Sequence, residues 1–326
     1  MSTETFNLKK SGNFLARYGT FTALILITLA FGLFVPKFAS FSNIMTLLVQ
    51  ISMLSIVASG LTAVFVVGEL DISTGAVVSL GGILGAYLMN NQIPPAAAIV
   101  ATLLVGVVFG VVNGFIVGYL RIPALLGTFG TSVIALGLNF WAGNGSSIRI
   151  SKEVTSEFFM SLGSGTFVGI PIPFVVALMV FIFFLFLLEH TKWGLRMYSV
   201  GGNQEAATNF GINNRRMKFT AFVFCGLTAA IAGLLLSSRL GAGSPIAGDA
   251  YTLDAIAAVY VGVSMFREGE PHLFGSVLGV LIFGILVNGM RLMGVGYEVQ
   301  SILRGIFILG AVAIAGNRAQ LRVKLF

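Results

Sequence analysis

The sequence predicts an all-α membrane protein that crosses the bilayer about ten times, and its composition and long apolar segments carry that prediction. Of 326 residues, 56% are hydrophobic and 10% are charged, and the mean hydropathy is +0.97. A soluble domain carries about 25% charged residues. A water-soluble globule is therefore excluded, because so few charges could not cover its surface. The same composition excludes intrinsic disorder.

Ten segments have the apolar character of a spanning helix, which needs about 20 residues. The third and the eighth are short and contain glycines. The predicted spans are residues 19–36, 44–68, 72–89, 95–119, 122–142, 172–189, 219–243, 247–265, 273–293 and 299–316.

The distribution of basic residues predicts the orientation of these spans. If the N-terminus is inside, 13 of the 19 lysines and arginines fall on the inner side. Cytoplasmic loops of membrane proteins carry such an excess of Lys and Arg. We therefore expect both termini to be cytoplasmic, and we expect the basic connection 190–218 to be cytoplasmic as well.

An internal repeat is predicted within a single transmembrane domain that covers residues 1–326. A shift of 175 residues places four spans of one half, 44–142, on four spans of the other, 219–317, and Asn113 then meets Asn288. Each span runs opposite to its mate, as in the inverted repeats of transporters. The alternative is that apolar spans of similar length align easily.

Several kinds of chemistry are excluded by residue counts. Cys225 is the one cysteine, and two histidines are present, so neither a cysteine cluster nor a histidine metal site is expected. No Gly-Lys dipeptide occurs, so no phosphate-binding P-loop is present. We expect no cofactor, no metal and no enzymatic activity. The net charge of +7 reflects basic cytoplasmic loops rather than nucleic-acid binding.

Residues 68–75 (GELDISTG) place two carboxylates between long apolar runs. Ionisable residues within a membrane are costly and usually face protein or water. One interpretation is a broken helix at the transport path, with Glu69, Asp71 and Ser73 lining the path or a gate. The simpler one is that Asp71 or Ser73 caps the following helix and Glu69 lies in a turn at the inner interface.

Residues 248–258 (GDAYTLDAIAA) are the counterpart in the second half. Asp254 precedes an alanine-rich run, so it is a candidate for the path or for a helix cap. Asn113 and Asn288 are polar groups within apolar helices. We expect them to hydrogen-bond between helices, with a position lining the path as the alternative.

The inner connection 190–218 predicts one short helix over residues 203–210, with Asn203 as its N-cap, Glu205 in its first turn and Gly211 as its stop. So short a helix needs a partner surface, either the chain's own membrane domain or another protein. The residues expected to contact that partner include a small apolar face; they are Gly202, Asn203, Glu205, Ala206, Ala207, Phe210 and Gly211. The basic residues nearby are expected to meet anionic lipid headgroups.

Three motifs in the same order resemble those of ribose-type ABC sugar permeases. The stretch 68–75 resembles their G-x-D-L-S-x-G signature, and residues 201–213 (GGNQEAATNFGIN) resemble their GGN-x-EAA…GI loop. Residues 247–258 resemble their AG-x-x-YELDAIAA segment. Where that family has GGTSL-x-GG-x-G, this chain has the charged turn 261–272 (VGVSMFREGEPH). This departure suggests a divergent subgroup.

The resemblance implies a permease subunit of an ATP-binding cassette importer in a bacterial plasma membrane, with a monosaccharide or related polyol as solute. It implies a dimer with a second copy or a paralogue, a cytoplasmic ATPase at the short helix, and a solute-binding protein outside. An ion-coupled secondary transporter is the alternative, but no long span carries a central carboxylate. A receptor explains neither the repeat nor the inner helix, and an intramembrane enzyme would need catalytic groups that the chain lacks.

Overall fold

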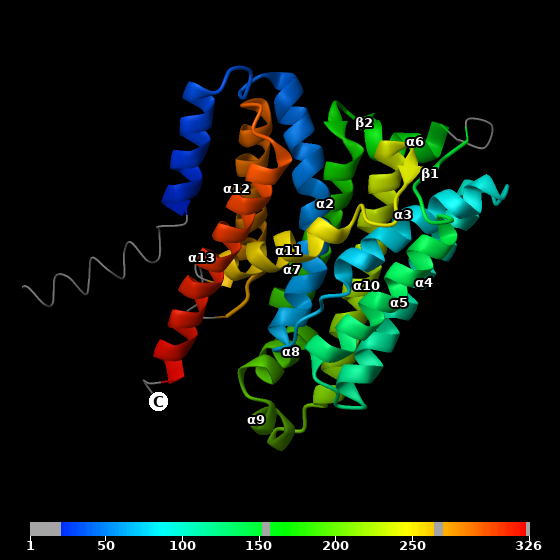
Figure 1. Ribbon diagram of the computed structural model, residues 1–326. Helices are drawn as coiled ribbons and strands as arrows, with labels where there is room; N and C mark the ends of the chain where they lie inside the picture. The colour runs from blue at the N-terminus through cyan, green and yellow to red at the C-terminus, as the bar shows by residue number, and fades with distance from the viewer. Residues whose placement is uncertain (1–20, 152–156, 264–269, 324–326) are drawn as a thin grey trace, which may run out of the picture. The chain divides into compact units, whose positions relative to one another are not determined.

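The computed structural model describes residues 21–151, 157–263 and 270–323, with side chains as far as residue 310. Its contacts divide the chain into two units: one is Leu48–Ala255, and the other combines the described parts of Met1–Leu47 and Ile256–Phe326. After a first helix, Phe21–Phe34, the helices are α2 (Phe41–Val66), α3 (Thr74–Asn90), α4 (Pro95–Gly118), α5 (Ala124–Ala142), α6 (Glu157–Ser164), α7 (Ile172–His190), α8 (Lys192–Gly202), α9 (Gln204–Asn209), α10 (Asn214–Leu240), α11 (Asp249–Val263), α12 (Leu273–Leu292) and α13 (Tyr297–Val323) (Figure 1).

The predicted all-α class is confirmed for the described residues. Their strands form two antiparallel pairs of two residues each. In the first, β1 (Ile148–Arg149) pairs with β4 (Ala242–Gly243), and Ile148 lies opposite Gly243. In the second, β2 (Thr166–Phe167) pairs with β3 (Ile170–Pro171). Both pairs only fasten connections between helices.

Each of the ten predicted segments contains a helix, and six of these helices are long and apolar enough to cross a membrane: α2, α4, α5, α7, α10 and α12. The helix Phe21–Phe34, α3 and α11 are shorter, with α3 having 17 residues and α11 having 15. The chain is therefore a polytopic membrane protein, and the count of ten crossings stays a prediction.

Helix α10 is the centre of the larger unit, where it packs along α3 and α4 (Figure 1). The reason is a series of small residues at which the backbones touch. A Cβ atom added to Gly106 would lie 2.6 Å from the carbonyl oxygen of Gly226, and one added to Gly110 would lie 2.5 Å from that of Phe222. Helices in lipid gain most of their association from such close packing.

The outer helices of this unit have exposed apolar faces. Only 22% of the apolar window of α7 is buried, compared with 61% for α10. On α4, the exposed side chains Val100, Leu104 and Val108 are spaced four residues apart and so lie on one face. A purely apolar exposed stripe is the surface expected to face lipid.

The smaller unit contains the first helix, α12 and α13, together with parts of α2 and α11. Val35, Phe38 and Ile285 form its apolar cluster. Gly262 and Gly275 bring α11 and α12 into backbone contact, since a Cβ on Gly275 would lie 2.5 Å from the Gly262 carbonyl oxygen. Residues 264–269 of the charged turn 261–272 lie outside the described residues, so the departure from the sugar-permease motif there stays a sequence observation.

Two helices of the described residues were not predicted. Helix α8 precedes α9, so the inner connection has two helices rather than one. Thr191 begins α8, because its side chain accepts hydrogen bonds from the backbone N–H groups of Trp193 and Gly194. Helix α6 lies in the polar connection between α5 and α7, for which no helix was predicted.

Candidate functional site

The helical backbone is interrupted between α2 and α3, as one interpretation of residues 68–75 predicted. Helix α2 ends at Val66, and Gly68 adopts a left-handed backbone with φ of 79°. The backbone N–H groups of Gly68 and Glu69 return to the carbonyl oxygens of Phe65 and Val64, at 2.9 and 3.0 Å. A glycine in this conformation is the usual way to end a helix. The following residues are thereby freed from helical pairing.

Asp71 lies at the centre of a buried hydrogen-bond network. Its side chain is 2% exposed, and its Oδ1 accepts hydrogen bonds from the backbone N–H of Ser73 at 2.9 Å and from the Ser73 hydroxyl at 2.6 Å. The Asn113 amide donates to Ser73 Oγ at 2.8 Å and to Asp71 Oδ2 at 3.4 Å. The Thr131 hydroxyl donates to Asn113 Oδ1 at 2.6 Å. This network ties the interruption to α4 and α5.

The expected helix caps are wrong at three positions. Ser73 occupies the position before α3 but makes no side-chain cap. The N–H bound by Asp71 belongs to Ser73, which precedes the helix, so Asp71 does not cap α3 either. Both side chains are instead occupied with each other and with Asn113. Asp254 lies inside α11, which begins at Asp249, and therefore cannot cap it.

The two carboxylate-containing stretches meet in the structure. The Thr252 hydroxyl accepts a hydrogen bond from the backbone N–H of Gly75, and the Ser79 hydroxyl accepts one from that of Gly248, both at 2.8 Å. Asn139 on α5 donates to a carbonyl on each side, Ala76 and Pro245, both at 3.1 Å. Thr252, Ser79 and Asn139 were not predicted from the sequence as site residues. Their positions within apolar helices were the available signal.

Asn113 and Asn288 both hydrogen-bond between helices, as the preferred interpretation predicted. Asn288 on α12 and Asn43 on α2 exchange amide hydrogen bonds of 2.9 and 3.0 Å, and Asn43 also donates to Phe38 O at 2.8 Å. The exposed fractions of Asn43 and Asn288 are 9% and 3%. Their hydrogen-bonding capacity is used within the protein, so these amides act as packing contacts in this conformation.

Glu69 forms an ion pair that the sequence did not reveal. Its Oε1 lies 2.5 Å from Nζ of Lys218, at the start of α10. The same ammonium donates to Gln204 Oε1 on α9 at 3.1 Å. Gly201, near the end of α8, packs directly on the Val66 carbonyl, so that a Cβ atom there would overlap it. The interruption after α2 is therefore connected to α8, α9 and α10.

Helix α9 has the predicted ends but only part of the predicted surface. Asn203 accepts a hydrogen bond from the Ala206 N–H at 2.9 Å, and Gly211 follows the helix with φ of 76°. Ala207 is 3% exposed, so the chain's own domain is its partner surface, as one of the two alternatives predicted, and its expected contact with the ATPase is wrong. Phe210 is 86% exposed.

The other residues predicted to contact the ATPase are also placed. Gly202 and Glu205 are exposed, and Ala206 is half-buried. With Phe210 they form the surface of α9 and its flanks that a partner could reach. Phe210 supplies a large exposed apolar side chain on this surface.

Comparison with known proteins decides the family. The model of the branched-chain amino acid transport system / permease component family matches residues 43–312. The chain belongs to this family of transport permeases. Relatives named as ribose import permeases confirm the resemblance to sugar permeases seen in the three motifs, and the chain is a multi-pass protein of the bacterial plasma membrane.

Curated relatives match this permease over most of its length. The ribose import permease protein of Haemophilus influenzae is 34% identical over 312 residues, which is 96% of each chain. The ribose import permease protein of Escherichia coli K12 is 32% identical, over 87% of this chain and 88% of its own. The L-arabinose transport system permease protein of Escherichia coli K12 is 34% identical, over 91% and 89%. No solved structure matches.

Proposed function

We propose that this chain is the membrane-spanning permease subunit of an ATP-binding cassette importer that takes up a monosaccharide, with pentoses as the first candidates. The observation that carries the proposal is the match to a ribose import permease over 96% of both chains. A second relative is named for L-arabinose. A related polyol remains within the proposed class, and the chain itself catalyses no reaction.

The permease crosses the membrane ten times, with both termini in the cytoplasm, and pairs with a second copy or a paralogue. The proposed inverted repeat is supported by the helix positions. Shifting α3 (Thr74–Asn90) and α4 (Pro95–Gly118) by 175 residues brings them onto α11 (Asp249–Val263) and α12 (Leu273–Leu292) to within about three residues. Paired halves of this kind place a solute path at their interface.

Transport requires a cytoplasmic ATPase and an external solute-binding protein, as in importers of this family. We infer that the ATPase binds at α9, around the exposed side chains of Glu205 and Phe210. Movement of α9 would reach the interruption after α2 through Gln204, Lys218 and Glu69, because these groups are in direct contact. Glu69→Gln removes one charge of this connection. We expect ATP hydrolysis to continue in this variant while solute uptake falls.

The proposal is tested by reconstitution. The permease, with the ATPase that co-purifies with it, is placed in liposomes with the solute-binding protein outside and ATP inside. Uptake of labelled D-ribose and L-arabinose is then compared with uptake by the permease alone under a proton or sodium gradient. We expect uptake only in the complete system with ATP. Gradient-driven uptake by the permease alone would instead establish the ion-coupled alternative.

A further inference from the structure

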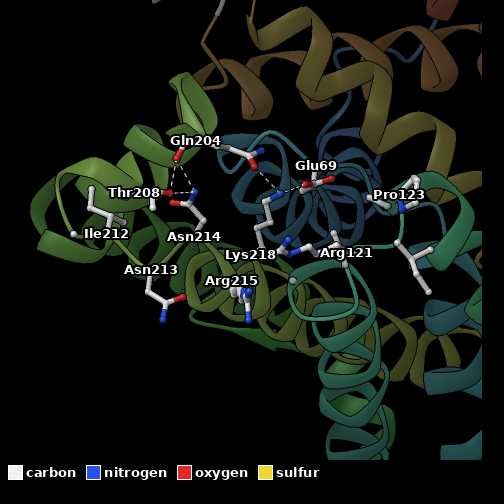
Figure 2. A pocket seen from close by; sticks show the side chains of 15 residues that line it. Glu69, Arg121, Pro123, Gln204, Thr208, Ile212, Asn213, Asn214, Arg215 and Lys218 are labelled. Carbon is white, nitrogen blue, oxygen red and sulfur yellow. Dashed lines mark hydrogen bonds and ion pairs between the residues drawn. The ribbon is translucent and has the colours of Figure 1, made fainter. Parts of the chain in front are cut away.

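A cavity of about 750 Å³ lies beside α9 in the larger unit (Figure 2). Its walls come from the turn between α4 and α5, from α9 and from the first turn of α10. Three basic side chains, Arg121, Arg215 and Lys218, and one carboxylate, Glu69, line it. These four charged groups therefore give the lining a net charge of +2, and a concave surface focuses such a charge on an entering anion.

Two of the three cations lack an acidic partner. Lys218 is paired with Glu69 at 2.5 Å. Among the described residues, no carboxylate forms an ion pair with Arg121 or Arg215. Figure 2 shows Arg121 and Lys218 among the side chains that line the cavity. Arginine binds phosphate strongly, because its planar fork of donors matches the geometry of phosphate oxygens.

The backbone at Arg121 also marks this turn. Its φ is 59°, in the left-handed region, and the Ile122 N–H returns to the carbonyl oxygen of Ile116 at 3.2 Å. Helices that end in this way usually place glycine or asparagine at the left-handed position. An arginine occupies it here, despite the strain, and strained positions of this kind cluster at binding sites. The turn thus holds a guanidinium at the cavity wall.

We propose that this cavity binds a phosphate ester, with Arg121 and Arg215 binding the phosphate. Two sources offer this chemistry: the glycerol headgroup of phosphatidylglycerol and a soluble sugar phosphate. A lipid could lay its chains along Leu120 and Leu126, which are 55% and 64% exposed.

The site would act on the connection between α9 and the interruption after α2. A bound phosphate competes with Glu69 for the Lys218 ammonium, because it would enter the cavity that Glu69 and Lys218 both line. Occupancy would thereby loosen the contact through which α9 reaches Glu69. A phosphate ligand would in this way regulate the permease from the side that carries α9.

The test measures binding to the purified full chain. In the first arm, the protein is held in phosphatidylcholine nanodiscs and titrated calorimetrically with ribose 5-phosphate, inorganic phosphate and ribose. In the second, it is purified from vesicles of mixed phosphatidylglycerol and phosphatidylcholine, and native mass spectrometry counts the retained lipids. Arg121→Gln and Arg215→Gln are compared with Arg216→Gln. Arg216 is the matched control, because it lies over the Trp193 ring and does not line the cavity.

We expect one of the two arms to show binding that weakens about tenfold in both cavity variants and is unchanged in Arg216→Gln, since each lost phosphate contact of this kind is worth about that factor. Binding of ribose 5-phosphate identifies the soluble source, and selective retention of phosphatidylglycerol identifies the lipid. The proposal is overturned if neither ligand binds, or if both cavity variants bind as the control does. It is also overturned if the cavity variants lose only the ATPase, which would make the basic cluster a protein contact.

Discussion

Replacing Phe210 with alanine is expected to weaken the contact with the ATPase while leaving the membrane fold intact. An aromatic side chain offers about 200 Å² of surface. With 86% of Phe210 exposed, roughly 170 Å² is available to a partner. If docking covers half of it, the lost burial costs about 2 kcal/mol at about 25 cal/mol per Å². This free energy corresponds to about thirtyfold weaker association.

The assay is co-purification of the ATPase with the variant, followed by ATP hydrolysis stimulated by solute-loaded binding protein. Phe167→Ala is the matched control, because Phe167 is 65% exposed on β2, which precedes α7, whereas α8 and α9 follow the other end of that apolar helix. The control should retain the ATPase, and the thermal stability of both variants should equal that of the parent. Full retention of the ATPase by Phe210→Ala, with full hydrolysis, would refute the role given to this ring.

Three further substitutions test the packing and the buried networks. Gly226→Ala should destabilise the protein by about 1–3 kcal/mol through overpacking against α4, seen as a lower thermal midpoint, whereas Gly130→Ala, with open space around it, should not. Asn288→Leu should cost about 1–3 kcal/mol by leaving the Asn43 side-chain oxygen and one amide hydrogen without a partner; adding Asn43→Leu should recover part of that loss, and no recovery would contradict the pairing. Asp71→Asn should lower the thermal midpoint, because Asp71 accepts the hydrogen bonds that hold the interruption after α2. Its uptake should fall by a factor that is the same at every pH from 6 to 8; a shifted pH optimum would indicate proton coupling instead.

The sequence predicted the class of protein and the positions of its helices because the bilayer imposes a local requirement. Each spanning helix must be apolar along its own length, so segments such as 95–119 and 172–189 could be located from composition alone, and α4 and α7 lie there. The ends of α9 were equally local, since Asn203 and Gly211 act within one turn. The ordered motifs then indicated the family.

The tertiary structure decided which polar side chains meet. Glu69 and Lys218 lie far apart in the sequence, and no local pattern pairs them; the packing of α10 beside the interruption does. Asp71 could have capped a helix, but its oxygens accept hydrogen bonds from Ser73 and from Asn113 on α4 instead. Ala207 belonged to an apolar face in the sequence, yet that side of α9 packs on its own chain. Burial and hydrogen bonding depend on the neighbours that a residue acquires on folding, and a linear sequence does not contain those distances.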